Sequence, residues 1–123
     1  MGANGMSALQ DFQQKRSAIF KSMLEITTIL PAPMQADNAN QFINGYLAVI
    51  ESALQGDLGP RDEYLGLVIP PLKQGQMPLG YIIGVLVGVN TALVAVIDHA
   101  HAPWYASFLS TYADKLCQLW ENS

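Results

Sequence analysis

The pattern of apolar and polar positions predicts a chain made of helices. Apolar residues recur every three or four positions along most of the sequence, which places them on one face of a helix. Prolines, glycines and capping residues divide this pattern into five segments, and no strand-like alternation of any length competes with it. We therefore expect an all-α fold, a compact bundle of about five helices with short connections and no internal repeat.

The first two helices are expected to be amphipathic. Ser7 is a suitable N-cap for the first helix, and Pro31 and Pro33 end it. Asp37 or Asn38 can cap the second. The inward stripes are Leu9, Phe12, Phe20, Met23, Thr27 and Leu30 in the first helix, and Ile43, Tyr46, Leu47, Ile50 and Leu54, with Phe42 at the margin, in the second.

Glycine and proline also delimit the third and fifth helices. Gly56 supplies a left-handed stop to the second helix, and Pro60 stands at a favourable first position of the third. Pro70 and Pro71 must break or kink that helix, because each removes a backbone donor. Pro103 starts the fifth helix. The inward residues are Tyr64, Leu65, Leu67, Val68 and Ile69 in the third helix, and Tyr105, Phe108, Leu109, Tyr112, Leu116, Leu119 and Trp120 in the fifth.

The fourth segment is different, because no charged side chain occurs from Gln74 to Ile97. Its helix is expected over about 78–98. About twenty apolar residues are enough to cross a bilayer, so one membrane-spanning helix is an alternative. However, Lys73 is the only nearby cation, and the next is Lys115, so orientation in a membrane would be poorly specified. The four amphipathic helices need an apolar partner, which favours a central helix buried on every side and makes a membrane unlikely.

Three glycines mark one face of this helix. Gly80, Gly84 and Gly88 recur every four residues, and each costs about 1 kcal/mol relative to alanine in a helix interior. Close packing would offset that cost. We expect the glycine face to be a tight crossing with another helix of the domain, the seam of a dimer, or the wall of a small ligand cavity.

Composition narrows the classes of partner. Half of the 123 residues are hydrophobic and only 13% are charged, and the formal charge is −4. The basic residues are scattered, so there is no cationic stripe for nucleic acid: they are Lys15, Arg16, Lys21, Arg61, Lys73 and Lys115. The single Cys117 cannot form an intramolecular disulfide, and we expect a buried thiol in a cytoplasmic protein. Residues 1–6 are expected to be a flexible leader without the features of a signal peptide, and 7–123 a single domain.

The candidate chemistry is sparse. His99 and His101 follow Asp98, which suggests a metal or haem ligand, but on a helix they point to different sides and no third ligand accompanies them. We favour a polar cap at the end of the apolar helix, where the helix dipole favours histidine. No catalytic motif surrounds the serines or Cys117, so an enzyme is not expected, nor is a cofactor or a metal.

Other conspicuous residues have both a packing and a binding interpretation. Asn90 is the one strongly polar side chain within the apolar helix, where it would fix helix register or contact a bound small molecule. Five aromatic residues could line a cofactor site, although their helical spacing favours core and interface packing: Trp104, Tyr105, Phe108, Tyr112 and Trp120.

The central part of the chain, 40–97, carries a recognisable order of motifs. The stretch 42–50, Phe-Ile-Asn-Gly-Tyr-Leu-Ala-Val-Ile, leads into Leu-Gln-Gly-Asp at 54–57, and the segments 64–70 and 75–79 precede the apolar helix. This order resembles the N-terminal sensor domains of RsbR-type stressosome proteins. The resemblance covers about half of the chain and implies a dimeric, globin-like helical module without haem. In that family a phosphorylatable STAS domain follows the sensor, so we expect this sequence to be either the isolated sensor domain or a stand-alone relative.

Together these features predict a cytoplasmic, non-enzymatic sensor domain for signal transduction in a stress response. It would form a homodimer through its first or last helix and pass a shift in helix packing to a signalling protein when a small ligand or partner binds. Two alternatives remain open. One is a regulatory module that binds a small hydrophobic ligand in a cavity along the glycine face, and the other is a single-span membrane protein.

Overall fold

The computed structural model describes residues 7–29 and 36–123, which are helical with no strand among them. The expected leader, 1–6, and the expected end of the first helix at Pro31 and Pro33 lie outside these residues. The helices are α1 (Ala8–Thr28), α2 (Ala36–Leu54), α3 (Gly59–Gln74), α4 (Leu79–Val94) and α5 (Ala102–Glu121), with a 3₁₀ turn, η1 (His99–His101), before α5. The prediction of an all-α fold with five helices is confirmed.

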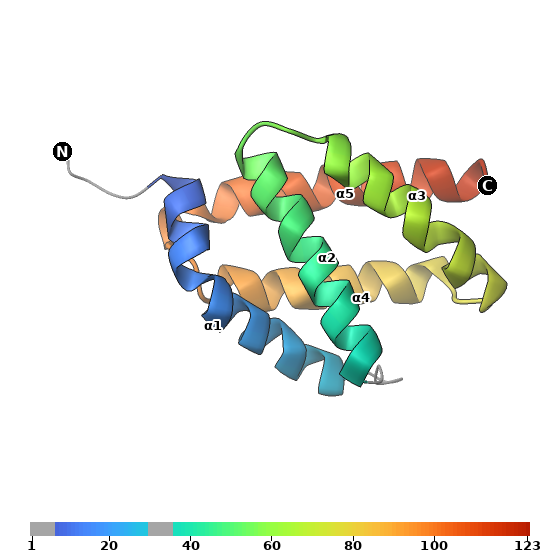
Figure 1. The fold of residues 1–123 in the computed structure, drawn as a ribbon, viewed down its shortest axis with the longest axis horizontal. Coiled ribbons are helices and arrows are strands. Elements are labelled where there is room, and N and C mark those ends of the chain that lie inside the picture. Colours follow the sequence, from blue (N-terminus) through green and yellow to red (C-terminus); the bar gives the residue numbers. More distant parts are fainter. Residues whose placement is uncertain (1–6, 30–35) are drawn as a thin grey trace.

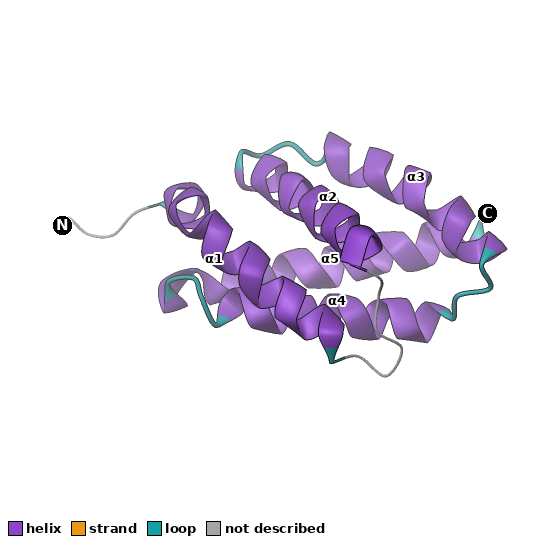
Figure 2. Cartoon of the chain, turned by 60° about the horizontal axis from the view of Figure 1, so that its bottom comes forward, coloured by secondary structure: helices purple, strands orange, loops and turns teal. Residues whose placement is uncertain are grey.

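The helices pack in two layers (Figure 1). The consecutive helices α4 and α5 run antiparallel in one layer, and α1, α2 and α3 lie across them. The turned view in Figure 2 shows the same arrangement. α1 packs on α2 and α4, whereas α3 packs on α2 and α5, so the chain closes around one apolar core.

Local signals place several helix ends as expected. Ser7 caps α1 with a capping box, in which its Oγ accepts from the Gln10 N–H and its own N–H donates to Gln10 Oε1, both at 3.2 Å. Gly56 has φ +89°, the left-handed conformation predicted for it. Pro60 lies at the start of α3, and Pro103 at the start of α5. These ends follow from chemistry within a few residues of the chain.

Two expected boundaries are wrong. α2 already includes Ala36, so Asp37 lies inside the first turn, where its charge favours the helix N-terminus. α3 does not break at Pro70 and Pro71 but continues through both to Gln74, whereas a kink at these prolines stays a prediction. Both prolines are exposed, and so is Gly66, whose carbonyl loses its Pro70 partner. Water can hydrogen-bond to such a carbonyl, which reduces the cost of the missing donors.

The expectation that the apolar helix is buried on every side is also wrong. α4 ends at Val94 instead of about residue 98. Its inward face is buried through Val85, Leu86, Val89, Asn90, Ala92 and Leu93. The opposite face is open to solvent, and Val87 there is 48% exposed. Leu67 of α3, expected to point inward, is likewise 74% exposed.

Candidate functional site

The three candidate glycines do not share one environment. A Cβ on Gly88 would lie 3.3 Å from Cγ2 of Ile26, so α1 crosses α4 closely at this point. Gly80 and Gly84 are exposed, and a Cβ on either would meet no atom of the described residues within 4 Å. Within the described chain, the predicted close crossing therefore occurs only at Gly88. A dimer seam at Gly80 and Gly84 stays a prediction.

The tightest glycine contact occurs in α2 and was not anticipated. A Cβ on Gly45 would lie 2.8 Å from Cζ and 2.9 Å from the hydroxyl oxygen of Tyr64, with Cε1 closer still. The Tyr64 hydroxyl donates to the Phe42 carbonyl at 3.3 Å. Gly45 thus lets an α3 ring lie directly on the α2 backbone. The sequence signal for this contact was a glycine in the interior of the second helix, because glycine lowers helix propensity and nothing local explains it there.

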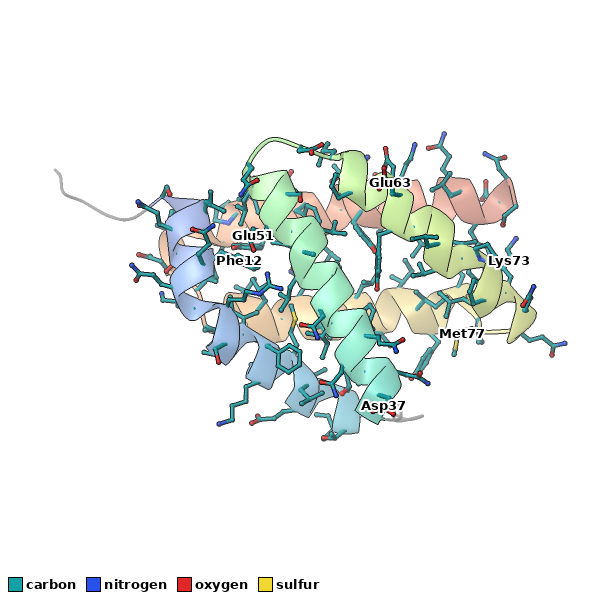
Figure 3. All side chains as sticks on the ribbon, viewed as in Figure 1. Phe12, Asp37, Glu51, Glu63, Lys73 and Met77 are labelled. Atoms are coloured by element: carbon teal, nitrogen blue, oxygen red, sulfur yellow. The ribbon has the colours of Figure 1, made fainter. Side chains whose placement is uncertain are left out.

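Beside this contact lies a groove of about 330 Å³ among α2, α3, α4 and α5. Its apolar walls include Phe42, Tyr64, Leu65, Leu67, Val68, Pro71, Leu72, Ile82, Leu86, Tyr112 and Leu116. The amides of Asn38 and Gln41 also line the groove, and none of the described residues that line it is charged. In Figure 3 the labelled Asp37 lies near the start of α2, and Glu63 and Lys73 lie near the two ends of α3. None of the three candidate glycines lines the groove, so it differs from the cavity predicted along the glycine face.

A second hollow, about 480 Å³, lies over the crossing of α1 and α2. It is lined mostly by polar side chains, including Gln13, Arg16 and Asn44. Arg16 forms an ion pair with Glu51 at 2.9 Å, and Gln13 donates to the same carboxylate. The cation of this hollow is thus already paired within the protein.

A chain of aromatic rings joins α5 to α2 behind the groove. Trp104 stacks on Phe108 with centroids 5.3 Å apart, and Phe108 approaches Tyr112 at 5.8 Å. Tyr112 meets Tyr46 edge-on at 5.2 Å, and Tyr46 stacks on Phe42 at 5.9 Å. Burial raises the pKa of Tyr46 and of Tyr112 well above the ordinary range. The predicted packing role holds for Phe108 and Tyr112, which are buried in the core.

A buried carboxylate, Asp11, links α1 to the connection between α4 and α5. Asp11 is 1% exposed, and its Oδ1 lies 2.7 Å from Lys15 Nζ. Its Oδ2 accepts the Asp98 N–H at 2.7 Å. Burial by itself would raise the pKa of Asp11, but the Lys15 and Asp98 hydrogen bonds and the nearby charges of Lys15 and His101 outweigh it and lower the pKa. This arrangement anchors the α4–α5 connection to the first turn of α1.

The two histidines do not cap the apolar helix as predicted. That helix ends at Val94, and His99 and His101 instead form η1, which Asp98 caps by accepting the Ala100 N–H at 3.0 Å. Among residues 7–29 and 36–123, no three His, Cys, Asp or Glu side chains are grouped as a metal site requires.

Two further candidate residues are Asn90 and Cys117. Asn90 is 7% exposed, and its Oδ1 lacks a hydrogen-bond partner among the described residues. Its predicted role in register or ligand contact stays a prediction. Cys117 is half-buried, less enclosed than expected.

No α-helix in the described ranges combines the length and hydropathy needed to cross a membrane. No protein-family model matches this chain, and neither a curated protein nor a solved structure is significantly similar to it. The resemblance to RsbR-type sensor domains therefore rests on the sequence motifs at 40–97 alone.

Proposed function

We propose that this chain is a non-enzymatic sensory domain that acts as a homodimer through the outward face of α4. This face, the α4 surface, consists of Gly80, Gly84, Val87, Thr91 and Ala95, all exposed. None of them is charged. The Thr91 hydroxyl donates to the Val87 carbonyl at 2.8 Å, so its polar group is already satisfied within the helix. This exposed uncharged surface is the observation that carries the proposal.

The first and last helices are weaker candidates for the seam. The exposed positions of α1 are mostly polar, including Gln10, Gln13, Gln14, Ser17, Lys21 and Glu25. Those of α5 include Ser107, Ser110, Thr111, Asp114, Gln118 and Glu121. Burying charged side chains carries a desolvation cost that the α4 surface avoids. We therefore place the seam on α4 instead of the first or last helix.

Two copies of one helix face can meet across a two-fold axis, where each residue contributes to the same surface twice. Gly80 and Gly84 leave room for the two backbones to approach, because neither carries a side chain. A displacement of α4 at the seam would reach α1 through the close Gly88–Ile26 contact. This is a physical route by which the dimer could transmit a packing change.

The resemblance to RsbR-type domains adds the biological part of the proposal. It suggests a globin-like sensor in a cytoplasmic stress-signalling system, with a signalling protein as partner. These assignments rest on the motifs at 40–97, and the proposed dimer does not depend on them.

The test is the oligomeric state by sedimentation equilibrium at micromolar concentration. We expect a dimer for the wild type and a monomer for Val87→Glu, which places a charge in the centre of the seam. Ala106→Glu adds the same charge at an exposed position of α5 and should remain dimeric. Circular dichroism should show that both variants remain folded. A monomeric wild type, or a Val87→Glu dimer as tight as the wild type, would refute the α4 seam.

A further inference from the structure

We propose that the groove among α2, α3, α4 and α5 binds a small, uncharged, mainly apolar molecule carrying a hydrogen-bonding group. Its volume, about 330 Å³, lies within the range of small-molecule sites. The groove is therefore large enough for a small ligand.

The helix arrangement explains why the groove is open. α3 packs on α2 and α5, whereas α4 packs on α1 and α5. The consecutive helices α3 and α4 thus share α5 as a neighbour but differ in the second helix that each contacts. Both helices line the groove, α3 with residues including Val68 and α4 with residues including Ile82. An apolar ligand there would contact both helices and remove their apolar surface from water.

The charge of the lining selects the class of ligand. Within the ranges 7–29 and 36–123, no Lys or Arg lines the groove to pair with an anion, and no Asp or Glu lines it to pair with a cation. An ion would lose hydration without gaining a partner, which is costly in an apolar site. The protein also has a formal charge of −4, which disfavours anions at long range. An uncharged molecule carries neither cost.

Polar groups at the groove would orient such a molecule. Asn38 and Gln41 contribute amides from the first turns of α2. Each amide offers both a donor and an acceptor, so one hydroxyl, carbonyl or amine of a ligand could be recognised. Phe42, Tyr64 and Tyr112 contribute aromatic rings to the same walls. This set favours a compact ring compound over a long flexible chain, since rings can pack flat against rings.

Two fluorescent probes of similar shape test the charge requirement. N-phenyl-1-naphthylamine is neutral, whereas 8-anilino-1-naphthalenesulfonate adds a sulfonate to the same aromatic framework. We expect saturable binding of one neutral probe per chain and affinity for the anionic probe at least about tenfold lower. Equal affinity for the two probes would overturn the proposal, because it would indicate unspecific apolar surface.

A pair of variants tests the location. Val68→Trp fills the groove and should weaken binding of the neutral probe at least about tenfold. Ala106→Trp adds the same side chain at an exposed position outside the groove and should bind as the wild type does. Unchanged binding by a folded Val68→Trp would overturn the assignment.

Measurements on the wild type keep the test decisive if Val68→Trp fails to fold. Neutral-probe chemical-shift changes should centre on Phe42, Val68 and Ile82, and changes centred elsewhere would refute the groove. The assignment of the ligand as the sensed signal rests on the proposed function. The binding of a ligand in the groove does not depend on that function. The monomeric Val87→Glu variant should therefore bind the neutral probe as the wild type does. If the wild type does not bind the neutral probe, the proposed ligand site is refuted, and the test of the dimer is unaffected.

Discussion

At the scale of single residues, the contact between Gly45 and Tyr64 places the strictest demand on side-chain identity. The ring lies where any Cβ on Gly45 would be, and its hydroxyl donates to the Phe42 carbonyl. Glycine is unfavourable within a helix, so the tertiary contact must offset about 1 kcal/mol of lost helix propensity. The contact also supports the wall of the groove to which Tyr64 belongs.

We expect Gly45→Ala to lower the melting temperature, although alanine is the better helix former. The new methyl group would displace the Tyr64 ring and its hydrogen bond to Phe42. A double-mutant cycle with Tyr64→Leu provides the control, and thermal denaturation is the measurement. Without the ring, Gly45→Ala should be neutral or stabilising, with a coupling of about 1 kcal/mol. A higher melting temperature for Gly45→Ala in the wild-type background would contradict the contact.

Asp11 gives a prediction in acid. Its folded-state pKa is lower than the ordinary value of 3.8, so its ionised form stabilises the fold. This contribution is fully present above pH 3.8 and is lost as the pH falls below it through the folded-state pKa. We expect Asp11→Asn to be less stable than the wild type near neutral pH, because the Lys15 ion pair is lost.

Urea denaturation across the acid range measures this difference. The gap between wild type and Asp11→Asn should narrow as the pH falls below 3.8. Asp114→Asn is a suitable control, since Asp114 is an exposed carboxylate on α5. A gap that stays constant with pH would show that the ionisation of Asp11 does not contribute.

At the scale of elements, α4 has two unlike faces, and its glycines test this difference. Gly88→Leu should overpack the crossing at Ile26 and destabilise the fold by about 1–3 kcal/mol. Gly80→Leu adds a side chain where nothing lies within 4 Å and should be neutral or stabilising by up to about 1 kcal/mol. Urea denaturation of both in the Val87→Glu background separates folding from dimerisation. Equal losses for the two variants would contradict the assignment of faces.

The ends of α3 and α5 are joined by Lys73. Its Nζ donates to the backbone carbonyl of Trp120 at 2.6 Å. The same Nζ lies 5.2 Å from the centroid of the Trp120 ring. We expect Lys73→Met to increase hydrogen exchange in the last turn of α5, since the Trp120 carbonyl at the helix end loses its charged donor and keeps weaker ones from Ser123. Lys21→Met removes the same charge from an exposed position of α1 and should leave that exchange unchanged. Equal exchange in both variants would argue against this cap.

At the scale of the whole molecule, the aromatic core resists ionisation. Burial raises the pKa of Tyr46, Tyr105 and Tyr112 above the ordinary value of 10.0, with the charge of Asp11 adding to the effect on Tyr105. Burial disfavours the phenolate form of these side chains, so they stay neutral in the fold. The fold therefore keeps its full stability below pH 10.0 and loses stability as the pH rises above that value.

We therefore expect phenolate absorbance from these three tyrosines to appear together with loss of helical circular dichroism. In urea they should titrate near the ordinary value of 10.0 instead. Titration of all five tyrosines of the folded protein near that value, with the helices intact, would contradict the burial.

The sequence by itself determined the number of helices and several of their ends. Ser7, Gly56 and Pro60 act through groups a few residues away, and such local chemistry can be read along the chain. The core stripe of α2 was also predictable, because Ile43 and Ile50 share one face of an amphipathic helix.

Only the tertiary structure decided how each face is used. α4 is apolar nearly all round, so its periodicity could not indicate that Val87 faces solvent while Leu86 enters the core. The contact of Gly45 with Tyr64 and the groove between α3 and α4 join residues far apart in the chain. Such features depend on which helices pack against each other, and helical periodicity carries no information about that choice.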